Sequence, residues 1–119
     1  MMDLIQNNNP NAWIAIDHGI AADLTLAPYT LRLKGEHSLY QAIADDDWVL
    51  ILNAAGHITR VGRVLRLRSD LETTTIYFDR MLLVDPAVPI GLTSLTPPSA
   101  GSVGRIQWTD FLESLPKAL

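Results

Sequence analysis

The clearest indication of this chain's fold comes from residues 47–90, DWVLILNAAGHITRVGRVLRLRSDLETTTIYFDRMLLVDPAVPI. The stretch is typical of three consecutive strands, because short apolar or alternating segments are separated by polar turns and no helical period runs through it. The first strand, over 48–52, is apolar throughout and is therefore expected to be covered on both faces. The other two, over 57–68 and 73–84, form a long hairpin. This pattern predicts a small β-barrel.

The strand over 57–68 has two unlike faces, since alternate side chains of a strand point to opposite sides. We expect its inner face to carry the apolar side chains Val61, Leu65 and Leu67. We expect its outer face to carry the basic side chains Arg60, Arg66 and Arg68. Gly62 marks either a bulge or a sharp bend, which a small barrel needs in order to close. The two prolines within 85–89 are expected to end the pairing, because proline donates no ladder hydrogen bond.

Shorter elements surround this core. Alternating or apolar segments predict strands over 12–17 (AWIAID) and 29–34 (YTLRLK). Helical spacing of apolar residues predicts helices over 38–44 (SLYQAIA) and 108–115 (WTDFLESL). Residues 1–11 are interpreted as a flexible lead-in, 93–104 as a loop rich in Pro, Gly and Ser, and 18–28 as either a loop or a short helical turn. The prediction is one α+β, mainly β domain over 1–119, with about five to six strands and two or three short helices.

Composition limits the class of protein. A chain of 119 residues that is 48% hydrophobic is expected to fold as a single globule. It has no cysteine, which excludes disulfides, thiolate zinc sites and cysteine nucleophiles and fits a reducing cytoplasm. The start, MMDLIQNNNPNAW, does not resemble a secretory signal, and no apolar run approaches the roughly 20 residues of a membrane span. We therefore expect a cytoplasmic protein that does not engage a membrane.

The net charge of −4 counts against unaided, tight binding to bulk nucleic acid. A nucleic-acid role then requires a local basic face, a pocket or a partner domain. The candidate phosphate-binding side chains lie on the strands at 29–34 and 57–68: Arg32, Lys34, Arg60, Arg66 and Arg68. Arginine on an exposed strand face can pair bidentately with phosphate. The alternative is a solvated face whose charge is balanced by Asp70, Glu72 and Asp79.

Three motifs carry a resemblance to a known family. They are AWIA in the first strand, the Asp-rich turn into WVLIL, and VGRV paired with IYFDR, which together span residues 12–90. The chain resembles the EVE-like domains of the PUA-like superfamily, although it departs from the family pattern between residues 18 and 30. The resemblance implies a PUA-like barrel that is not an enzyme and that holds a modified DNA base, flipped out of the duplex, in an aromatic pocket. Such domains are commonly joined to nucleases or helicase-type ATPases in restriction-modification and phage-defence systems.

Candidate residues for that base pocket are Trp13, Tyr29 and Trp48, with Asp17 and His18 at its rim and Tyr40 and Tyr77 as further aromatics. A flipped base needs flat apolar surfaces and a few polar groups that read its edge. The alternative for each ring is core packing, which is the usual place of an aromatic residue in a short strand.

Chemistry beyond binding has no motif to support it. The three histidines lack metal-ligand spacing, and Asp45, Asp46 and Asp47 are more typical of a solvated turn than of a cation site. The sequence contains no nucleophile elbow, P-loop or dinucleotide fingerprint, so we expect no catalytic residues, no metal and no cofactor. Two alternatives to the DNA reader stay open: a protein-interaction module that recruits a peptide by β-addition, and an RNA-binding PUA-like domain.

Overall fold

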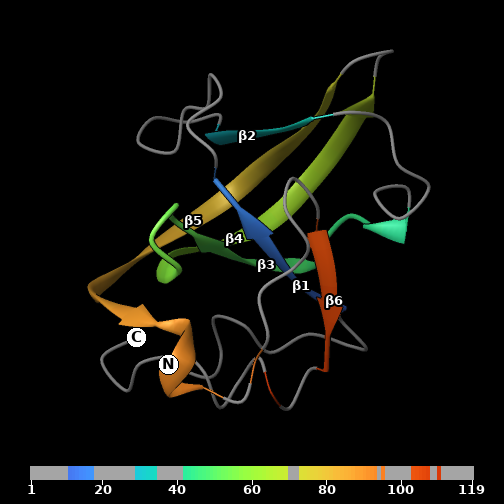
Figure 1. Ribbon diagram of the computed structural model, residues 1–119. Coiled ribbons are helices and arrows are strands. Elements are labelled where there is room, and N and C mark those ends of the chain that lie inside the picture. The colour runs from blue at the N-terminus through green and yellow to red at the C-terminus, as the bar shows by residue number, and fades with distance from the viewer. Residues whose placement is uncertain are drawn as a thin grey trace.

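The computed structural model describes residues 11–17, 29–34, 42–69, 73–93, 95, 103–107 and 110. The elements in this part of the chain are β1 (Ala12–Ile16), β2 (Tyr29–Lys34), β3 (Trp48–Leu52), β4 (His57–Ser69), β5 (Thr73–Pro89), the 3-10 helix η3 (Ile90–Leu92) and β6 (Val103–Ile106) (Figure 1). The six strands form one mixed sheet in the order β2-β5-β4-β3-β1-β6. Only β1 and β3 run parallel to each other. The prediction of a mainly β protein is therefore confirmed.

The strands predicted over 29–34 and 48–52 form as expected. The apolar WVLIL segment is β3, and all five of its side chains are buried, as expected for a strand covered on both faces. In β2 the alternation is also observed, since Leu31 and Leu33 are buried and Arg32 is exposed. Across the described residues β2 and β6 have one paired neighbour each, so the hydrogen-bonded sheet is open.

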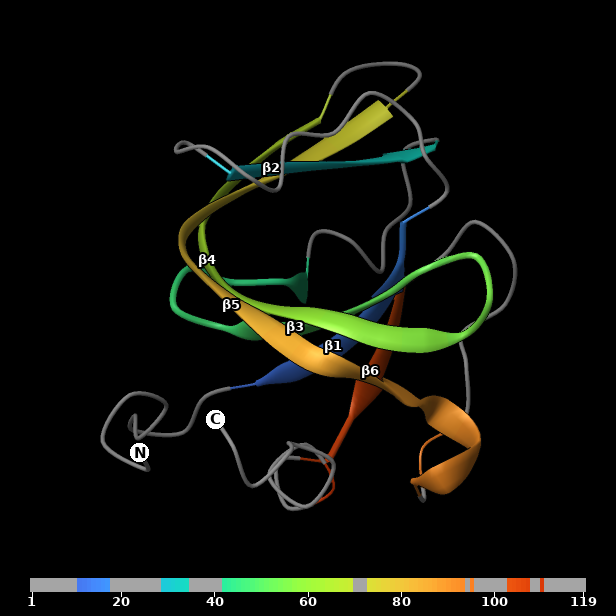
Figure 2. The same ribbon diagram turned by 90° about the vertical axis from the view of Figure 1, so that its left-hand side faces the viewer.

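The sheet curves strongly, and its two ends meet in one hydrophobic core. Figure 2 shows β4 and β5 bending together from β2 towards the layer that contains β1, β3 and β6. The concave side holds Leu31 from β2, Phe78 from β5 and Trp13 from β1 in a single buried cluster. A second cluster, which includes Trp48 and Leu50, packs on the opposite face of β1 and β3. Both faces of β3 are thereby covered.

Bulges in the long hairpin make one face prediction wrong. Strict alternation placed Leu65 inside, but Leu65 is 44% exposed, and Val64, which strict alternation puts on the face opposite Leu65, is fully buried. The register shifts between Arg63 and Val64 and again before Arg66, so Leu65 has no partner on β5. An extra residue in one strand reverses the side to which the following side chains point. The sequence pattern contains no direct sign of where such a residue lies.

Gly62 lies between the register shift at Ile58/Arg60 and the one at Arg63/Val64, in regular pairing with Val49 and Met81. A Cβ atom at this position would lie 2.6 Å from Cδ1 and 2.9 Å from Cε1 of Phe78. Glycine is therefore needed because the Phe78 ring packs directly on the backbone of β4, at the part of the hairpin where the sheet curves.

Two further expectations are corrected. The prolines do not end the hairpin, because β5 continues to Pro89 and pairs Val88 with Ile58 after a large bulge. That bulge contains Pro86, so its missing N–H falls outside the ladder. The predicted loop over 93–104 also overlaps a strand, since β6 begins at Val103 and pairs antiparallel with β1. A four-residue strand with a glycine has too weak a pattern to be predicted alone.

The predicted helices over 38–44 and 108–115 and the lead-in over 1–11 lie largely outside the described residues and stay predictions. No helix within the described ranges has the length and the apolar character that crossing a bilayer requires.

Candidate nucleic-acid interface

The convex face of β2, β5 and β4 gathers basic side chains from strands that are far apart in the sequence. The strand register forms two rows across this part of the sheet. One row contains Arg32, Thr75 and Arg68, and the next contains Thr30, Tyr77 and Arg66. We call these six residues the arginine face. Arg32 and Arg68 come from the two strands that flank β5, so only the folded sheet brings them together.

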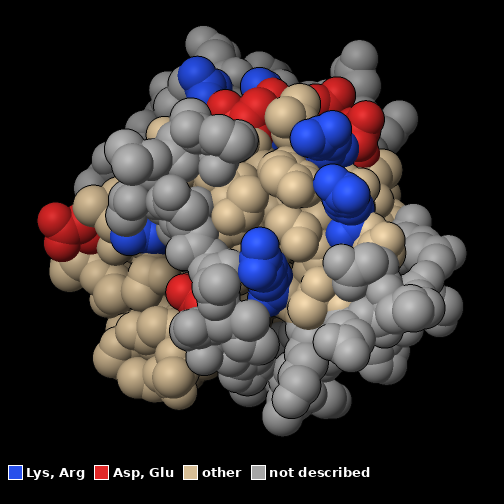
Figure 3. Space-filling view, turned by 90° about the horizontal axis from the view of Figure 1, so that it is seen from above, with Lys and Arg blue, Asp and Glu red and all other residues tan. Residues whose placement is uncertain are grey.

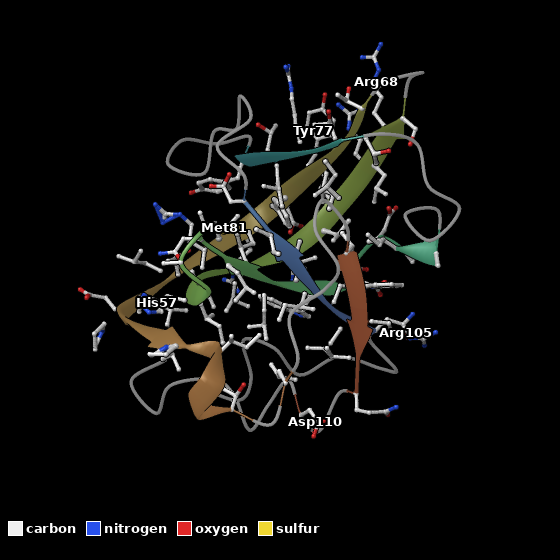
Figure 4. The ribbon with its side chains drawn as sticks, viewed as in Figure 1. His57, Arg68, Tyr77, Met81, Arg105 and Asp110 are labelled. Atoms are coloured by element: carbon white, nitrogen blue, oxygen red, sulfur yellow. The ribbon has the colours of Figure 1, made fainter. Side chains whose placement is uncertain are left out.

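Packing on the opposite side of the sheet fixes this orientation. Leu31, Ile76 and Leu67 alternate with the residues of the arginine face, and all three pack in the concave core. Because successive side chains of a strand point to opposite sides, the arginines are directed away from that core. Arg32, Arg66 and Arg68 are exposed, and Tyr77 is half-buried. Figure 4 shows Arg68 and Tyr77 at the same end of the molecule, far from Arg105.

Tyr77 and Arg66 form a cation–π pair on this face. The guanidinium carbon of Arg66 lies 4.7 Å from the centroid of the Tyr77 ring. A cation over an aromatic face at this distance is attracted to it by the ring quadrupole. The contact holds two flat groups together in the centre of the arginine face.

The nearest described acidic residue on β5, Asp79, is engaged by another arginine. Arg63 donates from Nε and Nη2 to the two carboxylate oxygens of Asp79, at 2.9 Å each. The hydrogen bond to Asp79 raises the pKa of Arg63, and burial opposes the shift. Arg63 pairs with Arg80, and Val64 pairs with Phe78, so Asp79 lies in a bulge between these two pairs. Its side chain can therefore meet that of Arg63. The predicted role of Asp79 as a counter-ion for the phosphate set is therefore replaced by a pair with Arg63.

This pairing leaves the face with a positive balance. Among the described residues the ion pair Arg63–Asp79 is the only one, so Arg32, Arg66 and Arg68 have no carboxylate partner there. Viewed from above, Lys and Arg side chains are spread over this end of the molecule, and acidic side chains gather mainly along one margin (Figure 3). The other proposed counter-ions, Asp70 and Glu72, lie outside the described residues.

The predicted phosphate set is brought together in part. Arg32, Arg66 and Arg68 share the arginine face, and the backbone of Lys34 pairs with that of Thr73 at the same end of β2. Arg60 is separate, because it lies on the far side of the β4 bulges and pairs with Ile51, a residue of the concave core. It is half-buried there.

The structure does not bring the two tryptophans of the predicted base pocket together. Trp13 and Trp48 are 0% and 1% exposed and belong to different core clusters on opposite faces of the sheet. Tyr29 is half-buried against the cluster that contains Trp13, and Asp17 is half-buried at the end of β1. His18 and Tyr40 lie outside the described residues. Core packing, the alternative given for each ring, describes both tryptophans.

Asp47 explains why Trp13 is held in place. The Trp13 indole Nε1 donates to Oδ2 of Asp47 at 2.9 Å, and the backbone N–H groups of Ala44 and Asn11 donate to the same carboxylate. Asp47 is 4% exposed, so the prediction of a solvated turn is wrong for this residue, although Asp45 and Asp46 are exposed. A buried carboxylate is tolerated because it accepts several hydrogen bonds. No cluster of metal-ligating side chains occurs within the described part of the chain.

Sequence reasoning placed Tyr77 among the pocket aromatics and missed its position beside the arginines. The available signal was the alternation in Thr75-Ile76-Tyr77-Phe78, which puts Tyr77 on the side opposite the two apolar residues. No family model matches this sequence, and no curated protein gives a significant match to it.

Proposed function

We propose that this chain is a non-enzymatic nucleic-acid-binding module that holds the phosphate backbone of DNA on its arginine face. The observation that carries the proposal is the meeting of Arg32 from β2 with Arg66 and Arg68 from β4 on one exposed surface. Guanidinium groups are well suited to phosphate, because they present several donors in one plane and stay charged at every physiological pH.

Asp79 supports this proposal. Its carboxylate is held by Arg63 at 2.9 Å, so the nearest described acid on β5 does not neutralise the three arginines. The chain as a whole carries −4, which repels a polyanion from the rest of the surface and orients it towards this face. Binding should then be modest and strongly dependent on salt.

The expected salt dependence follows from the number of contacts. Three arginines that neutralise three phosphates of a duplex predict a slope of about −2.7 for the logarithm of the binding constant against the logarithm of the salt concentration. Each phosphate contact that is removed should reduce the steepness by about 0.9.

Within this proposal, the curved sheet is the described part of a PUA-like barrel of the EVE type, acting in the cytoplasm beside a nuclease or ATPase partner. Recognition of a modified base stays a prediction from the family resemblance. The burial of Trp13 and Trp48 lends it no support, so the phosphate-binding face and not the aromatic pocket carries the proposal.

The test is fluorescence anisotropy with the full chain and short duplexes, unmodified and carrying methylated or hydroxymethylated cytosine or methylated adenine, over a range of salt concentrations. Arg32→Gln and Arg68→Gln should each weaken binding to every duplex and flatten the salt slope. Arg105→Gln is the matched control, since Arg105 is an exposed arginine on β6 at a distance from this face (Figure 4).

Equal weakening by Arg105→Gln would mean that net charge alone, and not this face, governs binding. No binding to any nucleic acid by the folded protein would overturn the proposal and favour the protein-interaction module. A preference for one modified duplex would add base reading to the phosphate contacts.

A further inference from the structure

We propose that the arginine face binds a single strand, with one unpaired base stacked on the Tyr77–Arg66 pair. This inference rests on the proposed function, and it adds the strand state of the nucleic acid and the residue that selects it. The observation behind it is the aromatic ring at the centre of an exposed basic surface, with the guanidinium carbon of Arg66 already lying over it, 4.7 Å from its centroid.

Two of the described residues beside Tyr77 have short side chains. Across the strands Tyr77 is flanked by Thr30 on β2 and Arg66 on β4, and the adjacent row has Thr75 at its centre. Threonine side chains are short, so they form a floor beside the ring and do not wall it off. A planar base can extend the stack that Tyr77 and Arg66 begin, because bases stack on both aromatic rings and guanidinium planes.

The spacing of the arginines fits the backbone of the same strand. Arg32 and Arg68 lie two strand spacings apart, roughly 10 Å between Cα atoms, on either side of Thr75. Their row is two residues from that of Tyr77, which is about 7 Å along the strands. A strand that crosses this row can therefore place phosphates at the arginines while a neighbouring base reaches the ring.

A duplex cannot use the ring in this way. Its bases are stacked on one another and paired, so it presents mainly phosphates to a convex surface. The arginines contribute to both forms of nucleic acid, but Tyr77 contributes only where a base is free to stack. The structure thus predicts a preference for single strands that depends on one side chain.

The experiment compares three probes by fluorescence anisotropy with the full chain: a short oligothymidylate, an abasic strand of the same length, and a duplex of the same length. The wild-type protein should bind the oligothymidylate more tightly than the abasic strand. Tyr77→Leu should weaken binding to the oligothymidylate by about 5- to 150-fold, the range found for loss of one base stack. The same variant should weaken binding to the abasic strand and to the duplex far less, because there Tyr77 acts only by holding Arg66 in place.

Tyr77→Phe is the matched control, since it keeps the ring and loses only the hydroxyl, and it should retain the single-strand preference. If Tyr77→Leu proves unstable, Tyr77→Phe still separates the ring from the hydroxyl. It removes any hydrogen bond that the hydroxyl makes and leaves the ring intact. Loss of the preference in Tyr77→Phe would assign it to the hydroxyl and overturn the stacking proposal.

The two proposals fail in different ways. Equal binding of the oligothymidylate and the abasic strand, with both weakened by Arg68→Gln, would overturn the stacking proposal and leave the phosphate-binding function standing. Binding of none of the three probes would overturn the proposed function itself.

Discussion

Gly62→Ala should destabilise the protein, although alanine is usually the better residue in a strand. Removing a glycine from a strand normally stabilises it by about 0.5–1 kcal/mol, because the unfolded chain loses freedom. The added Cβ would here lie 2.6 and 2.9 Å from two carbons of the Phe78 ring, well inside the ordinary carbon–carbon contact of roughly 3.5–4.0 Å. Phe78 is 1% exposed and has no solvent into which it can move.

The magnitude follows from these two opposing effects. Overpacking a buried site by one methyl group costs about 1–3 kcal/mol. Subtracting the gain from the unfolded state leaves a net loss of up to about 2.5 kcal/mol in the free energy of unfolding, and contacts as short as 2.6 Å place the effect in the upper part of that range. Met81 contributes less, since the atom that approaches the new Cβ, at 3.0 Å, is the terminal methyl group of a flexible side chain.

Urea denaturation followed by tryptophan fluorescence measures this loss as a lower midpoint with an unchanged slope. A double-mutant cycle with Phe78→Leu assigns the cause: the second substitution should cost at least about 0.5 kcal/mol less in the Gly62→Ala background than in wild type. Gly91→Ala is the matched control, because nothing lies within 4 Å of a Cβ at that position, and its effect should stay within about 0.5 kcal/mol. A neutral or stabilising Gly62→Ala would refute the close packing of Phe78 on β4.

Three further substitutions test the structure. Asp47→Ala should lower the free energy of unfolding by at least about 3 kcal/mol, because it leaves the Trp13 indole N–H and two backbone donors without an acceptor. A urea midpoint near that of wild type would contradict the buried hydrogen bonds. Asp79→Asn should tighten DNA binding by about two- to fourfold at low salt, since it frees Arg63 and removes a negative charge beside the arginine face; unchanged or weaker binding in anisotropy titrations would count against the electrostatic argument. Gly56→Ala should cost about 1–2 kcal/mol, because Gly56 has a φ of 82°; thermal melts that match wild type would show that the turn adopts another conformation.

Local patterns predicted most of the strands. YTLRLK alternates and becomes β2 with its leucines buried, and the uniformly apolar WVLIL becomes the doubly covered β3. These predictions hold because the spacing of apolar residues along a strand indicates which of its faces are buried. The identity of three of the phosphate candidates, Arg32, Arg66 and Arg68, could likewise be read from the outer positions of two strands.

Other features depend on residues far apart in the chain. The burial of Trp13 depends on Asp47, which accepts its indole N–H across 34 positions of sequence. The exposure of Leu65 depends on a bulge, which is set by how β4 and β5 share their ladder and not by the composition of β4. Neither could be predicted from a local pattern.

Local sequence pattern indicates the first five strands, the outward arginines on β2 and at the end of β4, and the absence of any cysteine chemistry. Tertiary structure alone decided that β5 lies between β2 and β4, and so placed Tyr77 between two strands that carry arginines. The physical reason is that alternation along a strand settles which side a residue takes, whereas the order of strands is settled by how the whole sheet buries its apolar surface.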